Sequence, residues 1–219
     1  MREQPVNVQR QRVFMCVAGV GLCGFSVGMF RTAALGVDPF TSMMTGLNTV
    51  VPMNYGTLYV IVNVLLLTFS LVFDRSKIGL GTIINLTLLG YIAEYSQYLM
   101  EYILGPLSLP GRVILLLSGI LVLCFSSAMY FNANLGVSTY DAISLVASER
   151  QTKISFKFCR MAGDVICVVI AAILLRAAGY TFAEMTAWIG VATIIIACFM
   201  GPLISFFSRC LPDPGHAVS

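Results

Sequence analysis

The chain has 219 residues, of which 58% are hydrophobic and 11% are charged, whereas about 25% of the residues in an ordinary soluble domain are charged. A compact soluble fold could not bury this much apolar surface, so the composition excludes a soluble enzyme, a disordered protein and a nucleic-acid-binding domain. The formal net charge of +3 is too small to indicate a polyanionic partner. The sequence therefore predicts an all-α polytopic membrane protein that lies in the lipid bilayer.

Six apolar stretches are suited to crossing a bilayer, for which about 20 mostly apolar residues are needed per helix. They lie at residues 13–30, 57–73, 79–99, 112–131, 160–178 and 186–207. The first contains no charged residue and is followed by no small-residue cleavage pattern. We therefore interpret it as a retained helix and not as a signal peptide.

Basic residues in short loops indicate which way the helices run. With the N-terminus in the cytoplasm, ten of the 13 basic residues fall in cytoplasmic segments. Only Arg31, Arg112 and Arg176 fall on the opposite side. This asymmetry predicts six transmembrane helices with both termini cytoplasmic.

The chain contains an internal repeat. After a shift of 100 residues, segment 12–47 aligns with segment 112–147 without a gap and with ten identical positions. A gapless match that ends in Leu-Gly-Val in both copies is difficult to obtain from shared apolar composition alone. We predict two units, residues 1–105 and residues 106–219.

Polar residues further along the chain also correspond between the two units. Asn63 matches Asp164, and the Gly79-x-x-Thr82 element matches a second Gly-x-x-Thr element at residues 190–193. Each unit carries three helices, an odd number, so the second unit must enter the membrane from the opposite face. Two inverted three-helix repeats are an architecture of secondary transporters.

A glycine bend follows the first helix of each unit, in the sequences LGVDPFT and LGVSTYD. After Gly36, Asp38 is suited to cap a new helix and Pro39 to its first position. After Gly136, Ser138 can cap a helix while Asp141 reaches back to complete a capping box. The pattern predicts short helices at Pro39–Leu47 and Thr139–Ala147.

These short helices are too brief to cross a membrane, and two placements remain open. They either lie at the membrane interface or re-enter the membrane, where irregular backbone must be shielded by protein or water. Re-entrant helices would bring N-termini with partial positive charge toward the centre from both faces. Such a pair would favour an anion or a carboxylate.

The run at residues 35–47, its counterpart at 135–145, and the later Arg160/Asp164, GxxT and GP elements resemble the YczE/YyaS/YitT family of bacterial membrane proteins. The resemblance covers nearly the whole chain. It implies a multi-pass protein of the bacterial cytoplasmic (inner) membrane. Because the activity of that family is mostly unassigned, the resemblance says little about a substrate.

The two bends differ from each other in the family pattern, which often has an acidic residue two positions after the proline. The first copy has Thr41 at that place. The second copy keeps Asp141 but has Thr139 in place of the proline.

Charged residues within apolar stretches are costly, by about 2.5–3.5 kcal/mol each on insertion scales. Asp164 lies within such a stretch, and Arg160 precedes it by one helical turn, so that the two can pair. Three roles remain open for Asp164: a proton or cation acceptor, the anchor for a cationic part of a substrate, or half of a structural pair near the cytoplasmic end. Asn63 is expected to bond between helices, and Glu94 to lie at the membrane interface among tyrosines.

The candidate residues for binding a substrate or ion come from the bends and from the charged pair. They are Gly36, Asp38, Pro39, Gly136, Ser138, Asp141, Arg160 and Asp164. We expect Asn63 and Glu94 to be structural.

Nothing in the sequence indicates catalysis or a cofactor. The seven cysteines form no CxxC and lie in apolar runs, which is typical of small buried side chains, and the one histidine, His216, lies in a polar tail. No nucleophile–base set and no nucleotide-binding loop of the GxxxxGK[ST] type occurs. We expect no metal, no cofactor and no enzymatic activity.

Two functions remain open. The first is a secondary transporter or permease for an unidentified small molecule or ion, with a site at the membrane midplane between inverted repeats. The second is a membrane module that does not transport by itself, such as a substrate-capture component or a regulatory or assembly partner of a membrane complex. Homo-oligomers and an energising or regulatory subunit are compatible with either function.

Overall fold

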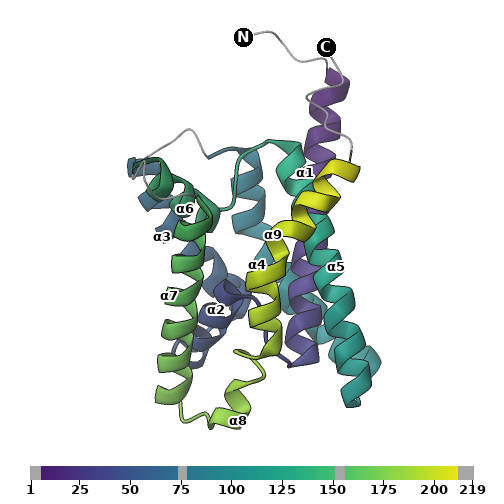
Figure 1. The fold of residues 1–219 in the computed structure, drawn as a ribbon, viewed down its shortest axis with the longest axis vertical. Coiled ribbons are helices and arrows are strands. Elements are labelled where there is room, and N and C mark those ends of the chain that lie inside the picture. Colours follow the sequence, from purple (N-terminus) through teal and green to yellow (C-terminus); the bar gives the residue numbers. More distant parts are fainter. Residues whose placement is uncertain (1–5, 74–77, 151–155, 212–219) are drawn as a thin grey trace.

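A computed structural model describes residues 6–73, 78–150 and 156–211 of the chain (Figure 1). In these residues the regular structure is helical, which confirms the predicted all-α class. The helices are α1 (Val6–Ala33), α2 (Pro39–Val50), α3 (Tyr55–Phe73), α4 (Leu80–Leu104), α5 (Leu109–Ala133), α6 (Thr139–Arg150), α7 (Phe156–Ala177), α8 (Phe182–Met185) and α9 (Val191–Cys210).

Four helices of the described chain are long and apolar enough to cross a membrane. They are Val8–Ala33 in α1, Tyr55–Phe73 in α3, Leu109–Ala133 in α5 and Phe158–Ala177 in α7. Each coincides with one of the six predicted stretches. The other two predicted stretches correspond to α4 and α9, which have 25 and 20 residues.

The last helix begins at Val191, so the bound predicted at residue 186 was wrong. The Thr193 hydroxyl accepts a hydrogen bond from the Gly190 N–H at 3.2 Å, and this cap starts a new helix there. The preceding α8 has its own cap, in which the Thr181 N–H and hydroxyl both donate to Glu184 and lower the pKa of that carboxyl. The two short helices after the bends run three residues past their predicted ends, to Val50 and Arg150.

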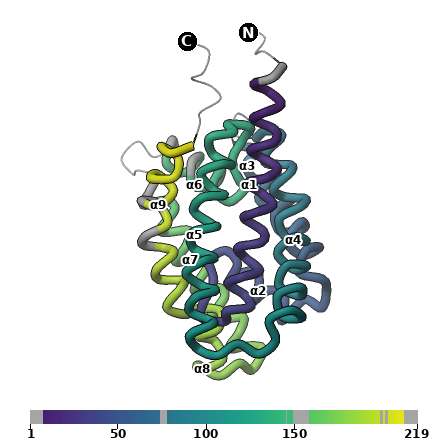
Figure 2. Tube along the Cα trace, turned by 90° about the vertical axis from the view of Figure 1, so that its right-hand side faces the viewer, coloured from purple at the N-terminus to yellow at the C-terminus, as the bar shows by residue number. Residues whose placement is uncertain are grey.

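The helices other than α8 form two groups that lie beside each other (Figure 1). In the α1 group (α1, α4, α5 and α9), α1 packs against α4 and α5, and α5 packs against α9 (Figure 2). In the α7 group (α2, α3, α6 and α7), α2 packs against α7, and α6 packs against both α3 and α7. The two groups are joined where α3 packs against α4.

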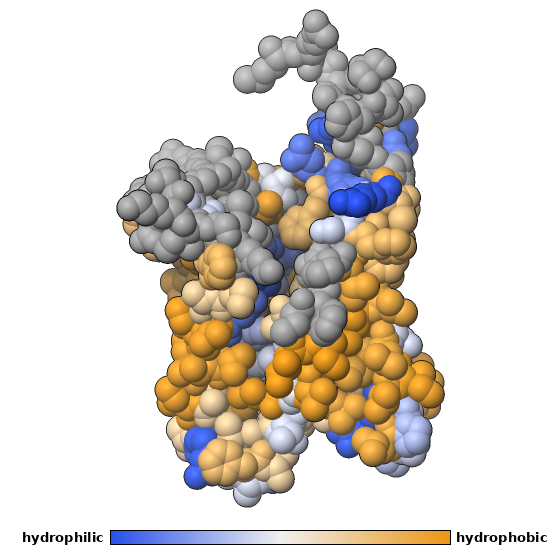
Figure 3. Space-filling view, in the orientation of Figure 1, coloured by the Kyte–Doolittle hydropathy of each residue, from blue (hydrophilic) through white to orange (hydrophobic). Residues whose placement is uncertain are grey.

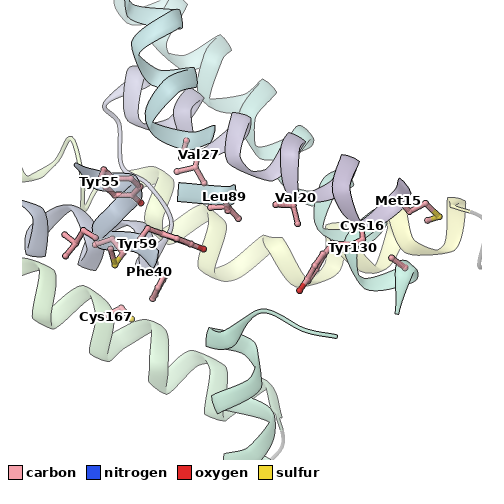
Figure 4. Packing of buried hydrophobic residues seen from close by; sticks show 14 residues of the cluster. Met15, Cys16, Val20, Val27, Phe40, Tyr55, Tyr59, Leu89, Tyr130 and Cys167 are labelled. Atoms are coloured by element: carbon pink, nitrogen blue, oxygen red, sulfur yellow. The ribbon is translucent and has the colours of Figure 1, made fainter. Parts of the chain in front are cut away.

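A cluster of buried apolar side chains has members from both groups (Figure 4). Val20 of α1 and Leu89 of α4 belong to the same buried cluster as Tyr59 of α3. Cys16 and Cys167 are buried free thiols in this cluster, as predicted for cysteines in helix packing.

The sharp bends after α1 and α5 depend on glycine. Gly36 has a φ of +107° and Gly136 a φ of +108°, which residues with a Cβ rarely adopt. A Cβ on Gly36 would lie 2.8 Å from the Gly190 nitrogen, and one on Gly136 would lie 2.6 Å from the Gly79 nitrogen. Both the backbone conformation and the close approach of a second backbone segment therefore require glycine.

Backbone hydrogen bonds at each bend join distant parts of the chain. The Ala192 N–H donates to the Leu35 carbonyl at 3.1 Å, and the Gly81 N–H donates to the Leu135 carbonyl at 2.8 Å. The bend after α1 makes two further backbone bonds, to the carbonyls of residues 187 and 188. The bends thereby fix where α2 and α6 begin.

Arg112, in the first turn of α5, binds the C-terminal end of α1. Its guanidinium donates to the carbonyls of Ala33 and Ala34, in the last turn of a helix, where carbonyls lack partners within the helix. The positive charge also complements the partial negative charge of a helix C-terminus. The sequence places Arg112 on the non-cytoplasmic side but gives no indication of this role.

Candidate functional site

A cavity of about 580 Å³ lies between the α1 group and the α7 group. Every helix except α8 contributes residues to its wall. Figure 3 shows a hydrophilic strip in the groove between α7 and α9, flanked by hydrophobic side chains. The cavity thus combines a largely apolar wall with a smaller set of polar and charged side chains.

Most of the candidate residues predicted from the sequence meet at this cavity. Its wall includes Asp38, Pro39, Ser138, Asp141, Arg160 and Asp164. The two bend glycines do not line it. Gly36 packs against Gly190, and Gly136 lines a separate pocket of about 530 Å³ beside Gly79. Both glycines form tight backbone turns next to the cavity.

Side-chain oxygens cap the helices that begin at the cavity, as predicted. Asp38 Oδ1 accepts a hydrogen bond from the Thr41 N–H at 3.0 Å at the start of α2. At the start of α6, Ser138 Oγ accepts from the Asp141 N–H at 3.1 Å and donates to Asp141 Oδ2 at 2.6 Å. These two N–H groups are therefore occupied by the chain itself and are not open to an anionic ligand.

Arg160 lies between two carboxylates in the cavity wall. Its Nη1 forms an ion pair with Asp141 Oδ1, and its Nε lies 3.3 Å from Asp164 Oδ1. The three side chains are only 13–27% exposed. We refer to them as the Asp141–Arg160–Asp164 cluster. The pairing predicted from the i,i+4 spacing is present, and Asp141 is a further member that spacing alone did not reveal.

Tyr140 connects this cluster to the aromatic part of the wall. Its hydroxyl donates to Asp164 Oδ1 at 2.8 Å, and the Arg160 Cζ lies 4.3 Å from the centre of its ring. On the other side, Tyr140 packs against Phe40 with ring centres 5.0 Å apart, and Phe40 contacts Tyr59 at 5.8 Å. These aromatic residues were not predicted from the sequence. The one available signal was that Phe40 and Tyr140 occupy the same position in the two aligned segments.

Asn63 and Glu94 hold helices together, as expected for structural residues. Asn63 Oδ1 accepts a hydrogen bond from the Thr139 hydroxyl and so connects α3 to the start of α6. Asn63 also lines the cavity. Glu94 Oε2 accepts from the Gly56 N–H at 3.0 Å, which ties α4 to the first turn of α3 away from the cavity.

The fold and this site define a class of protein: an all-helical membrane protein with a charged cavity enclosed by apolar helices. The chain belongs to the family of unknown function DUF6198, whose model matches residues 10–209.

The family match and one of two relatives support a YczE-like membrane family, which confirms the resemblance predicted from the motifs. The chain is 24% identical to the uncharacterized membrane protein YczE of Bacillus subtilis over 135 residues, or 61% of each chain. It is 23% identical to an uncharacterized protein of Haemophilus influenzae over 213 residues, 96% of this chain and 89% of that one. No solved structure matches the chain significantly.

Proposed function

We propose that this membrane protein is a secondary transporter or permease for a small molecule or ion. In this proposal α1, α3, α4, α5, α7 and α9 cross the cytoplasmic membrane as two inverted three-helix repeats. The short helices α2 and α6 enter from opposite faces, and the cavity is the substrate site. Both termini are cytoplasmic, which agrees with the start of α1 and the end of α9 lying at the same end of the molecule (Figure 1).

Equivalent contacts in the two halves support the inverted repeat. The packing of α1 against α4 corresponds to that of α5 against α9, and the packing of α2 against α7 corresponds to that of α6 against α3. The two bends also correspond, because the first contacts the start of α9 and the second contacts the start of α4. A two-fold relation between the halves accounts for each of these pairs.

The charged cavity is the observation that carries the transport proposal. Inserting charged residues among apolar membrane helices costs free energy, so such residues indicate a functional site with a binding partner. In this protein the charges face a cavity large enough for a small molecule and come from both proposed repeats. A purely structural role would need only the Arg160 ion pairs and not the open volume beside them.

One departure from the repeat symmetry suggests how access alternates. α3 packs against α4, whereas the corresponding helices α7 and α9 do not pack comparably in the described chain and leave the groove seen in Figure 3. We propose that transport exchanges these two arrangements, closing α7 onto α9 and separating α3 from α4. Such an exchange is the rocking of one unit against another around a fixed site.

The transport proposal predicts that the protein alone moves a solute that stabilises it. A thermal-unfolding screen of the detergent-purified chain against metabolites and ions identifies that solute. Vesicles reconstituted with this chain alone should then show counterflow of the labelled solute, and vesicles without protein should not. A solute that stabilises the protein but does not cross the vesicle membrane contradicts the proposal.

The inverted repeat predicts opposite accessibility for the two ends of the molecule. In a variant without the native cysteines, Pro106→Cys and Ala178→Cys should react with a membrane-impermeant maleimide in intact cells. Arg10→Cys and Arg209→Cys should react only after permeabilisation. All four positions are exposed in the structure, so labelling reports on the side of the membrane. Labelling of residues 106 and 209 from the same side contradicts the proposed topology.

A substrate-capture component is the second candidate, because the same cavity would serve a protein that hands its ligand to an energising subunit. Such a component would bind solute alone and transport it only within a hetero-complex. The vesicle experiment separates the two candidates, and purification from mild detergent reports whether the chain carries a partner or forms homo-oligomers.

A further inference from the structure

The wall of the cavity holds more acidic than basic side chains. It holds three carboxylates, Asp38, Asp141 and Asp164, and among the described lining residues Arg160 is the one basic side chain. Arg160 pairs with two of the carboxylates. No described lysine or arginine forms an ion pair with Asp38. An anionic ligand would add to this excess of negative charge, whereas a cationic ligand would offset it.

The helix N-termini at the cavity do not reverse this preference. Their partial positive charge is complemented by the chain's own oxygens, since Asp38 bonds the Thr41 N–H and Ser138 bonds the Asp141 N–H. A carboxylate at a helix N-terminus is a favourable arrangement that reduces the attraction for a second anion. The bends alone predicted an anion site. The side chains of the cavity wall do not support that prediction.

Tyr130 gives an independent indication of a ligand from the α1 group. It lines the cavity, it is only 6% exposed, and its hydroxyl has no hydrogen-bond partner within the described part of the chain. Figure 4 shows this hydroxyl pointing away from α1. A buried hydroxyl without a partner is unfavourable, so a polar atom of a ligand or a bound water would complete it.

The aromatic and apolar parts of the wall indicate an organic rather than a metal cation. The rings of Phe40, Tyr59 and Tyr140 line the cavity, and aromatic faces attract organic cations. A volume of about 580 Å³ is typical of sites for small organic molecules. Among the described residues, no group of three or more His, Cys, Asp or Glu side chains is placed to hold a metal ion.

We propose that the cavity binds an organic ammonium ion, with its charged group among Asp38, Asp141 and Asp164 and its apolar part against the aromatic wall. The Tyr130 hydroxyl would bond a polar substituent of the same ligand. This inference rests on the proposed function, because it assigns a class of substrate to the proposed transport site.

Three probes of nearly equal shape and different charge test this assignment. Choline is cationic, 3,3-dimethyl-1-butanol replaces its nitrogen by carbon and is neutral, and 3,3-dimethylbutanoate is anionic. Titration of each into the detergent-purified full chain, followed by thermal unfolding, should give saturable stabilisation by choline and none by the other two. Tetraethylammonium, a larger cation, should also stabilise the protein.

Matched variants connect the binding to the cavity. Asp164→Asn and Tyr130→Phe should each weaken choline binding, the former by at least about tenfold because it removes a charged partner. Glu101→Gln is the control, since Glu101 is exposed and bonds Gln97 at the end of α4. It removes a carboxylate without touching the cavity and should leave choline binding unchanged.

The possible outcomes separate this inference from the transport proposal. Stabilisation by dimethylbutanoate, equal stabilisation by choline and dimethylbutanol, or no response to either ammonium ion overturns the organic-cation assignment and leaves transport of another solute intact. Choline binding that depends on Asp164, without counterflow of choline in vesicles, supports the assignment and contradicts transport.

Discussion

Asp164→Asn is expected to reduce solute counterflow by at least about tenfold while leaving the fold intact. The substitution keeps the size of the side chain and an oxygen that can accept the Tyr140 hydroxyl bond. Arg160 retains its ion pair with Asp141, so no unpaired guanidinium is left in the cavity. What is lost is the negative charge, and a hydrogen bond to a charged group contributes about 1.5–3 kcal/mol, or a factor of about 10–150 in binding.

Two measurements together decide this prediction. Counterflow in reconstituted vesicles reports function, and the midpoint of thermal unfolding of the same preparation reports the fold. Glu101→Gln removes an exposed carboxylate outside the cavity and should change neither quantity. Wild-type counterflow by the Asp164→Asn protein would show that the carboxylate serves packing and not transport.

Much of the local structure was predictable because its determinants lie within a few residues of each other. Apolar stretches of suitable length predicted the positions of the long helices. The capping roles of Asp38 and Ser138 follow from residues three positions away, and each forms the predicted bond. The positive φ of Gly36 and Gly136 follows from a Leu-Gly-Val turn between two helices.

The remaining features of the site depend on contacts between segments that are distant in the chain. No pattern in a single sequence predicts such contacts. Phe40 and Tyr140 are 100 positions apart and meet only because α2 and α6 converge. The sequence places Arg31 on the non-cytoplasmic side but does not show that its guanidinium lies over the Tyr55 ring, 3.9 Å from its centre. The opening between α7 and α9 is likewise a property of packing, and composition predicts apolar helices on both sides of it.

Gly36→Ala and Gly136→Ala are each expected to lower the free energy of unfolding by about 2–6 kcal/mol. A residue with a Cβ is strained at these φ values, by about 1–3 kcal/mol. Its Cβ would also overlap the backbone of Gly190 or Gly79, and overpacking adds about 1–3 kcal/mol. Unfolding by SDS in mixed micelles measures the change for each variant.

Three further glycines separate the two contributions. Gly79 has an extended φ of −146°, so Gly79→Ala adds only the overlap, with the Leu135 carbonyl. Gly179 has a φ of +91° and no atom within 4 Å of an added Cβ, so Gly179→Ala adds only the strain. Gly21, inside α1, has neither problem, and its alanine variant should be neutral or stabilising by up to about 1 kcal/mol.

If Gly36→Ala destabilises no more than Gly179→Ala, the close backbone contact at the bend contributes nothing. An effect at one bend but not at the other would contradict the proposed correspondence of the two bends in an inverted repeat.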